Sequence, residues 1–331
     1  MVHAIEAHDL VKVFKGGITA LDGVSLAVES GTVFGLLGPN GAGKTTAVRI
    51  LTTILRPDSG SATVLGHDVV RESSLVRASI GLAGQYAAVD ENLTGRENVR
   101  LIGQLTHLSR KVANQRADDL LERFELTDAA NRAVKTYSGG MRRRLDLAAA
   151  LVDRPPVLFL DEPTTGLDPY SRMALWAVIE ELTEAGATVL LTTQYLEEAD
   201  RLADRLVVVD HGRVIAEGTS AELKANLGAT VLDMDMGDVE RARQAAGILS
   251  ELARRFQREP VLQGTVVELA LDGGARMVTE ALVLLDEAGL VPATLAMREP
   301  SLDDVFLALT GHGVTEAEAS AEMATQAKGR R

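Results

Sequence analysis

The stretch Gly38–Thr46 is the most informative part of this amino-acid sequence. It reads GPNGAGKTT and fits the phosphate-binding pattern G-x-x-x-x-G-K-[ST] without a gap. The apolar run 33–37 before it predicts a buried strand, and residues 47–51 after it predict the first turns of a helix. In a loop between a strand and a helix, glycines let successive backbone N–H groups point into one concavity. The stretch therefore predicts a nucleotide-binding α/β domain.

The side chains and amides of this loop have separate expected roles. The helix N-terminus behind the loop adds partial positive charge. Lys44 is expected to reach the β- and γ-phosphates, and the Thr45 hydroxyl to ligate Mg²⁺. The residues expected to contact the nucleotide are Gly38, Pro39, Asn40, Gly41, Ala42, Gly43, Lys44, Thr45 and Thr46.

Composition narrows the class of protein and the partners it can have. A chain of 331 residues suggests about two domains of roughly 150 residues. The absence of cysteine excludes disulfides and thiolate metal sites, and the N-terminus lacks the pattern of a signal peptide, so we expect a cytoplasmic protein. A formal net charge of -13 disfavours broad contact with nucleic acid. No stretch approaches the ~20 apolar residues of a membrane-spanning helix, so another chain would have to supply any span.

The hydrophobic pattern predicts the order of the other elements. Strands are expected at 4–12, 24–28, 61–65, 80–83, 157–160 and 188–192, with a hairpin formed by 206–210 and 213–217. Charged sequence of helical period indicates a helical insertion at 87–150, and from about residue 228 the pattern restarts as a small αβ unit that ends in a helical turn at 302–307.

The expected fold class is α/β. It consists of a P-loop NTPase (RecA-like) core with an antiparallel β subdomain and a helical subdomain, followed by a small C-terminal α+β domain. We place the nucleotide-binding domain at 1–227 and the accessory domain at 228–312. The Ala/Glu-rich tail 313–331 has no face to bury, so we expect it to be disordered.

Two carboxylates follow the apolar strand 157–160. Asp161 and Glu162 stand at its C-terminal end, where doubly wound folds place their chemistry. Successive residues of a strand end project in different directions, so Asp161 can serve Mg²⁺ while Glu162 serves a water molecule. Without the phosphate-binding loop, such a pair would be read as a solvated turn.

Three further features allow more than one interpretation. Ser138, Gly139 and Gly140 begin a second helix, which favours either another anion site or a plain N-cap serine followed by glycines. Phe14 is either a core residue or an aromatic that stacks on adenine. The cluster Arg142–Arg144 indicates a helix face or a patch near phosphate rather than a nucleic-acid site.

The ordered set of motifs resembles the nucleotide-binding subunit of an ABC transporter. The set consists of Gly38–Thr46, Gln85, Ser138–Gly140, Asp161–Glu162 and Asp168, and it covers roughly residues 3–225. More narrowly, residues 137–144, 191–200 and 301–307 resemble the daunorubicin-resistance ATP-binding proteins, and this likeness extends to about residue 312.

The resemblance implies a head-to-tail homodimer in which ATP lies between the P-loop of one chain and the Ser138–Gly140 loop of the other. Phe14 takes the place of the family's adenine-stacking aromatic residue. Gln85 matches the loop that senses Mg²⁺ and the membrane subunit, so the implied magnesium site contains Thr45, Gln85 and Asp161. Asp168 matches the loop that crosses the dimer interface.

Two positions depart from the common pattern of the family. Met141 replaces a glutamine, which we expect to be a mild change because the serine hydroxyl and the glycine amides carry the phosphate contact. Gln194 stands where most ABC proteins have a histidine. Its amide can donate a hydrogen bond to a γ-phosphate, but it cannot carry charge or shuttle a proton.

The implied activity is ATP hydrolysis coupled to export. Lys44, Glu162 and Gln194 would be the catalytic residues, ATP with Mg²⁺ the cofactors, and the cytoplasmic face of the membrane the location. A separate membrane subunit would bind the substrate, an amphiphilic drug or lipid. Two other functions stay open: a soluble ABC ATPase that acts on DNA or ribosomes, and a nucleotide-gated regulator with little hydrolysis. An importer also remains open, because the cassette does not encode direction.

Overall fold

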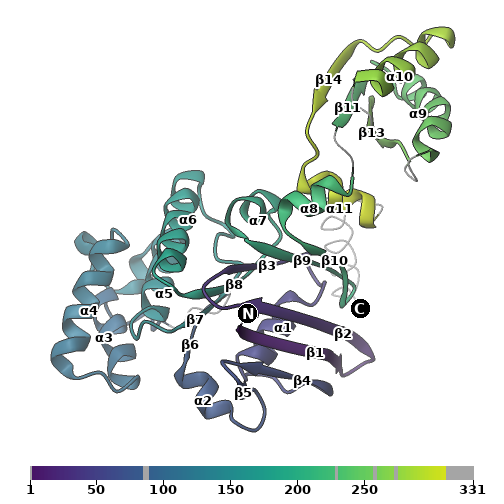
Figure 1. Cartoon of the computed structure of the whole chain (residues 1–331). Helices are drawn as coiled ribbons and strands as arrows, with labels where there is room; N and C mark the ends of the chain where they lie inside the picture. Colours follow the sequence, from purple (N-terminus) through teal and green to yellow (C-terminus); the bar gives the residue numbers. More distant parts are fainter. Residues whose placement is uncertain (1, 85–88, 228–229, 256–258, 272–274, 311–331) are drawn as a thin grey trace. The chain divides into compact units, whose positions relative to one another are not determined.

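The computed structural model describes residues 2–84, 89–227, 230–255, 259–271 and 275–310 (Figure 1). The chain divides after Thr219 into two compact units, and each is described by itself. Among the helices of these ranges, none combines the length and the apolar character that crossing a bilayer requires.

A six-stranded sheet forms the centre of the first unit, in the order β10-β9-β3-β8-β7-β6. Its strands are β3 (Val33–Leu37), β6 (Ile80–Ala83), β7 (Val157–Asp161), β8 (Thr188–Thr193), β9 (Arg205–Asp210) and β10 (Arg213–Gly218). All neighbours pair in parallel except β10, which forms the expected hairpin with β9. Every residue of β3, β7 and β8 is buried, which explains their continuous apolar runs.

A second, antiparallel sheet packs beside this centre in the order β2-β1-β4-β5. Its strands are β1 (His3–Phe14), β2 (Ile18–Glu29), β4 (Ser59–Val64) and β5 (His67–Asp68). Helix α1 (Lys44–Leu51) shares one hydrophobic core with both sheets and contacts β2, β4 and β7. The antiparallel β subdomain is therefore as expected, and the helix that follows the phosphate-binding loop is held between two sheets.

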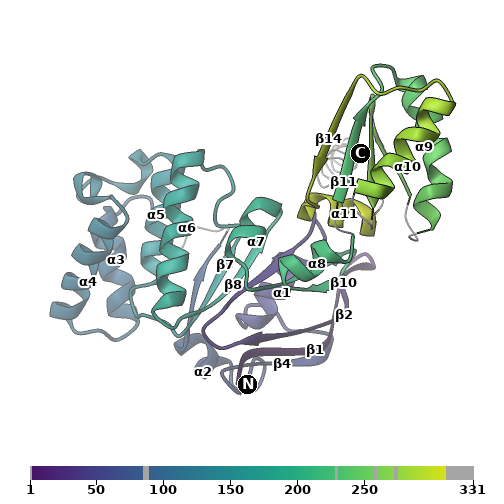
Figure 2. The ribbon, with the colours of Figure 1, turned by 45° about the horizontal axis from the view of Figure 1, so that its top comes forward.

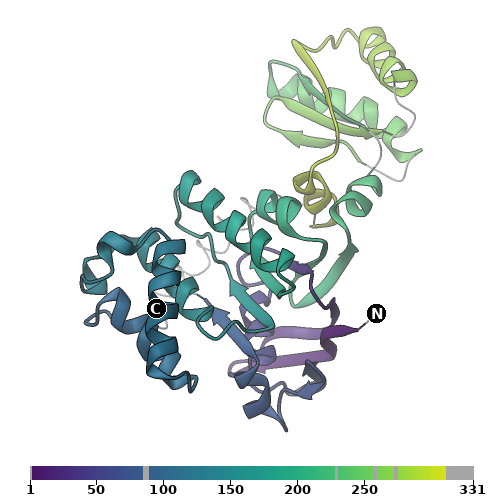
Figure 3. The same cartoon turned by 60° about the vertical axis from the view of Figure 1, so that its left-hand side comes forward.

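The helices between β6 and β7 form the expected helical part. They are α3 (Gly95–Leu105), α4 (Arg110–Arg123), the 3₁₀ turns η1 (Thr127–Ala129) and η2 (Val134–Thr136), and α5 (Gly139–Ala150). Thr94 and Glu97 form a capping box at α3, and Ser109 caps α4. Helix α6 (Pro169–Glu184) and helix α7 (Leu196–Leu202) follow β7 and β8. Figure 3 shows the blue and teal helices gathered on one side of this unit.

The second unit has a four-stranded antiparallel sheet in the order β12-β13-β11-β14. Its elements are α8 (Ser220–Ala225), β11 (Thr230–Asp235), α9 (Val239–Arg254), β12 (Val261–Gln263), β13 (Val266–Leu271), α10 (Ala275–Glu287), β14 (Thr294–Arg298) and α11 (Leu302–Thr310). Helices α9 and α10 cover one face of the sheet and close a separate core (Figure 2). On β14, the Arg298 guanidinium donates to Asp233 of β11 and to Asp304 of α11, so α11 is fixed to the sheet.

Most of the predicted elements are present with small shifts at their ends. The short helices α2 (Ser73–Ala78), α7 and α8 were not predicted, because six or seven residues are too few to show a helical period. The domain boundary that we predicted at 227 stays a prediction. In the structure, α8 groups with the second unit, which begins at Ser220. The tail 313–331 lies outside the described residues.

Candidate functional site

The phosphate-binding loop connects β3 to α1, and glycine is required at two of its positions by packing. A Cβ atom at Gly38 would lie 2.2 Å from the carbonyl oxygen of Val209, and one at Gly43 would lie 2.3 Å from that of Ala20. Gly43 is also the N-cap of α1, with a φ of 110° that L side chains rarely adopt. A glycine cap leaves the first backbone N–H groups of α1 without a side-chain acceptor, which suits an anion.

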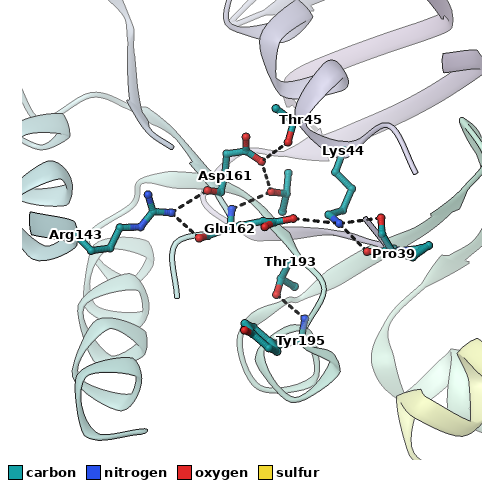
Figure 4. Close-up of polar contacts among 10 residues, drawn as sticks. Pro39, Lys44, Thr45, Arg143, Asp161, Glu162, Thr193 and Tyr195 are labelled. Atoms are coloured by element: carbon teal, nitrogen blue, oxygen red, sulfur yellow. Dashed lines mark hydrogen bonds and ion pairs between the residues drawn. The ribbon is translucent and has the colours of Figure 1, made fainter. Parts of the chain in front are cut away.

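Lys44 and Glu162 form a buried ion pair beside this loop. The Lys44 ammonium lies 3.2 Å from Glu162 Oε1, and the two side chains are 3% and 7% exposed (Figure 4). The same ammonium donates to the carbonyl oxygens of Gly38 at 2.7 Å and Pro39 at 3.1 Å. The cation expected to bind phosphate and the expected base therefore meet at the end of β7.

On the other side of the strand end, the Asp161 carboxylate accepts hydrogen bonds from two threonine hydroxyl groups. Its Oδ1 atom accepts hydrogen bonds from Thr45 Oγ1 at 3.2 Å and from Thr192 Oγ1 at 2.6 Å. A hydroxyl and a carboxylate are hard oxygen ligands, and Mg²⁺ typically binds one or two carboxylates and completes its shell with phosphate oxygens and water. Among the described residues, no group of three or more His, Cys, Asp or Glu side chains is arranged so that it could hold a metal ion. Thr45 and Asp161 fit a magnesium ion.

The backbone of Glu162 has an unusual conformation. Its φ is +50°, in the left-handed region, which costs a residue with a Cβ about 1–2 kcal/mol. Its N–H donates to Thr192 O at 3.1 Å and Thr192 Oγ1 at 3.0 Å, while its carbonyl oxygen accepts from Arg143 Nη2 at 2.5 Å. Both backbone polar groups are thus held by neighbouring elements, which stabilise the turn that aims the carboxylate at Lys44.

The second glycine-rich helix start belongs to a different layer of the same unit. Ser138 caps α5 by accepting a hydrogen bond from the Met141 N–H at 3.2 Å. Helix α5 contacts α3, α4 and β6, whereas α1 contacts β2, β4 and β7 (Figure 1). A Cβ atom at Gly139 would meet nothing within 4 Å, and one at Gly140 would make only ordinary contacts. Packing within the described residues therefore does not require glycine at 139 or 140.

The structure places the other predicted site residues as follows. Phe14 ends β1 with 39% of its surface exposed, so core packing does not account for it. Asp168 caps α6 by accepting from Ser171 N and Ser171 Oγ, and these hydrogen bonds lower the pKa of its carboxyl group. Gln194 follows β8, and its buried Oε1 atom has no hydrogen-bond partner among the described residues. Gln85 lies outside the described residues.

Sequence reasoning missed a buried cluster next to the end of β8. Trp176 Nε1 of α6 donates to Glu198 Oε1 of α7 at 2.9 Å, and the Glu198 side chain is fully buried. The guanidinium groups of Arg172 and Arg201 lie over the Trp176 ring, 5.3 Å and 5.1 Å from its centre. Burial raises the pKa of the Glu198 carboxyl, against the opposing effect of its hydrogen bonds and of Arg172. Glu198 stands in a charged run beside Glu197, and nothing in the sequence distinguishes the buried glutamate from its exposed neighbour.

We expect Glu198→Gln to change how stability depends on pH. Because folding raises the pKa of Glu198, the native state is favoured while this group is protonated, and that contribution is lost as the pH rises through the folded pKa. The amide keeps an acceptor for Trp176 and does not ionise. The melting temperature of the variant relative to the natural protein should therefore rise by about 2–4 °C between pH 5 and pH 8, equivalent to roughly 1 kcal/mol.

Thermal unfolding at several pH values measures this difference. Glu197→Gln is the matched control, because Glu197 is the adjacent residue and its side chain is 70% exposed. A relative melting temperature of Glu198→Gln that does not change with pH would contradict the assignment.

Comparisons with known proteins agree with this geometry. Residues 21–165 match the family model described as ABC transporter. The chain is 52% identical over 310 residues to the daunorubicin/doxorubicin resistance ATP-binding protein DrrA of Streptomyces peucetius, and the match covers 93% of each chain. It is 50% identical to the doxorubicin resistance ATP-binding protein DrrA of Mycobacterium tuberculosis, over 89% of this chain and 90% of that one.

A more distant relative and two solved structures are ATP-binding proteins as well. The chain is 40% identical to the Nod factor export ATP-binding protein I of a Rhizobium species, over 93% of this chain and 97% of that one. An ATP-binding subunit of an ABC transporter superposes with a TM-score of 0.62 at 29% identity, covering 67% of this chain and 92% of that one. A dimeric ATP-binding cassette in a post-hydrolysis state with ADP and Pi superposes with a TM-score of 0.61 at 27% identity, covering 65% of this chain and 98% of that one.

These matches assign the activity as well as the fold. The chain binds ATP and is an ATPase of the ABC transporter family. Subunits of this kind dimerise and act with separate membrane subunits. The chain belongs to the ATP-binding proteins of ABC transporters, in the group of the daunorubicin-resistance proteins.

Proposed function

We propose that two copies of this chain hydrolyse ATP with Mg²⁺ at their shared interface and so drive export of an amphiphilic drug or lipid. The observation that carries the catalytic part is the buried pair of Lys44 and Glu162, 3.2 Å apart, at the strand end that also brings Thr45 to Asp161. A separate permease at the cytoplasmic face of the membrane binds the exported compound.

The chemistry follows from the positions of these side chains. The ammonium of Lys44 turns from the Gly38 and Pro39 carbonyls to the β- and γ-phosphates, which stabilises charge that develops on the transferred group. That movement releases the Glu162 carboxylate to orient a water molecule and accept its proton. Thr45 and Asp161 hold Mg²⁺, which supplies further neutralisation of phosphate charge.

Two positions complete the proposed nucleotide site. The amide of Gln194 donates a hydrogen bond to the γ-phosphate and takes no part in proton transfer, since an amide does not titrate in this range. The half-exposed ring of Phe14 stacks on the adenine. Gln85 is included in the proposed magnesium site because it matches the family pattern.

The dimer interface is proposed from the glycines of the α5 start. Neither a positive φ nor packing within the described residues calls for glycine at 139 and 140. Glycine is used where another molecule must approach the backbone closely, so a phosphate bound to a second copy explains both positions. In that arrangement Ser138, Gly139 and Gly140 close over the partner's ATP, and Asp168 lies at the interface.

The exported compound is inferred from the relatives. Two carry names for resistance to daunorubicin or doxorubicin, and one is named for Nod factor export. These names favour outward transport and an amphiphilic substrate. The second unit, with its terminal helix α11, is proposed to stabilise the dimer or to contact the permease.

A transport assay tests this function. The chain is produced together with the membrane protein encoded beside its gene, and inside-out membrane vesicles are prepared. We expect ATP-dependent accumulation of doxorubicin in these vesicles, and none when either protein is omitted or when Glu162→Gln replaces the natural chain. Phosphate release without accumulation would contradict transport, and nucleic-acid-stimulated turnover would favour a soluble ATPase. Binding of ATP without phosphate release would favour the nucleotide-gated regulator.

A further inference from the structure

Arg143 of α5 makes an unusual set of contacts for a charged side chain. Its guanidinium donates to the carbonyl oxygens of Asp161 at 2.8 Å and Glu162 at 2.5 Å (Figure 4). It also donates to those of Pro163, at 2.7 Å, and Gly84. The side chain is 14% exposed. One side chain of α5 therefore holds the end of β7 and the end of β6 together.

The neighbouring arginines behave differently. Arg142 binds Glu91 and the Lys135 carbonyl, and Arg144 binds Glu125 and the Phe124 carbonyl. All of those partners lie within the helical part of the unit. We expected this cluster to form a helix face or a patch near phosphate. Of its three arginines, Arg143 alone reaches the catalytic strand, so the cluster is not one uniform surface.

Only an arginine can make this set of bonds. The guanidinium offers five N–H donors in a rigid, planar fork, whereas lysine has one nitrogen and glutamine one amide group. Burial lowers the pKa of Arg143, and the carboxylates of Asp146, Asp161, Glu162 and Glu198 oppose that effect. The buried charge is thus matched by acidic groups around the site, while the hydrogen bonds go to backbone oxygens.

These contacts bear on the strained backbone of Glu162. Its N–H is held from β8 by Thr192, and its carbonyl oxygen is held from α5 by Arg143. A left-handed conformation persists in a residue with a Cβ only when surrounding structure fixes it. Without the hydrogen bond from Arg143, the carbonyl oxygen of Glu162 is no longer fixed, and the backbone that directs its carboxylate is less constrained.

We propose that Arg143 is a positioning residue for hydrolysis, which fixes the backbone of Glu162 and makes its carboxylate depend on the placement of α5. The helix that carries Arg143 begins at Ser138–Gly140, the loop proposed to close over the partner's ATP. Closure of that loop and alignment of Glu162 are thereby linked through one side chain. The proposal rests on the role of Glu162 under the proposed function.

The test is a double-mutant cycle on ATP turnover. Arg143→Met is expected to lower kcat about 10²-fold, the cost of misplacing a catalytic group by about 1 Å, while the KM for ATP changes by less than about threefold. In the Glu162→Gln background the same substitution should lower the residual single-turnover rate by less than about threefold, because the group it positions is already lost. Arg143→Lys should recover part of kcat. Arg142→Met is the matched control and should keep kcat within about twofold.

The outcomes distinguish a failure of the proposed function from a failure of the positioning role of Arg143. Unchanged turnover of Glu162→Gln would remove Glu162 from its role and overturn the proposed function. A normal kcat for Arg143→Met beside an inactive Glu162→Gln would overturn only the positioning role. The same conclusion would follow if Arg143→Met lowered the rate by the same factor in the Glu162→Gln background as in the natural protein. If Arg143→Met fails to fold, Arg143→Lys replaces it in the same cycle, and a purely structural role would then lower thermal stability and ATP affinity together with kcat.

Discussion

Replacing Glu162 by glutamine is expected to lower ATP turnover by about 10²–10⁴-fold while ATP binding is retained, because general-base catalysis contributes a factor of that size. The amide has the shape of the carboxylate, so the backbone holds from Thr192 and Arg143 remain. It cannot accept a proton from the attacking water. Steady-state phosphate release measures the loss, and titration with ATP measures the binding. Glu184→Gln, at an exposed position of α6, is the control and should keep full turnover.

The same variant gives a direct readout of the proposed dimer. With hydrolysis blocked, ATP and Mg²⁺ should hold two copies together, so light scattering after gel filtration should report twice the monomer mass. Ser138→Arg in this background should restore the monomer, because a large side chain at the cap of α5 blocks the second copy. A monomer at saturating ATP in the Glu162→Gln protein would contradict the shared site.

Replacing Lys44 by methionine is expected to abolish turnover and to weaken ATP binding by about 10–100-fold, in line with the 1.5–3 kcal/mol of hydrogen bonds to a charged group. Methionine keeps the length of the side chain but removes the ammonium that lies 3.2 Å from Glu162. The remaining carboxylate then repels the triphosphate. Calorimetric titration with ATP measures the change, and Lys111→Met, at an exposed position of α4, should bind ATP normally.

A double variant separates the two effects of that substitution. If repulsion by Glu162 contributes, Lys44→Met combined with Glu162→Gln should bind ATP more tightly than Lys44→Met alone. Equal affinities would show that the ion pair has no part in nucleotide binding, and that the ammonium acts on the phosphates only.

The sequence was sufficient for the parts of the fold that repeat a short pattern. Buried parallel strands give continuous apolar runs, and the loop Gly38–Thr46 fits its motif without a gap, so β3, β7, β8 and the start of α1 could be placed. The pairing of β4 with β1 joins segments about fifty residues apart and follows from packing around α1, which no local pattern encodes.

The site was predictable as a set of residues but not as a geometry. Asp161 and Glu162 were identified from their place after a strand, yet the left-handed turn at Glu162 depends on contacts from β8 and α5. Three consecutive arginines look alike in a sequence, and only the direction of α5 determines that Arg143 points to β7. Thr192 carries no motif of its own, although its hydroxyl binds both carboxylate residues.

The two glycine-rich helix starts differ in the requirement that keeps glycine at their positions. At Gly38 and Gly43, a side chain would collide with the backbone of β9 and β2, so the requirement for folding alone is enough to keep glycine there. At Gly139 and Gly140 the chain itself imposes no such demand. A homologue that had lost ATP hydrolysis would still need Gly38 and Gly43 to fold, whereas Gly139 and Gly140 could be substituted. Substitution of the second pair would therefore be the earlier sign that a related gene has lost this activity.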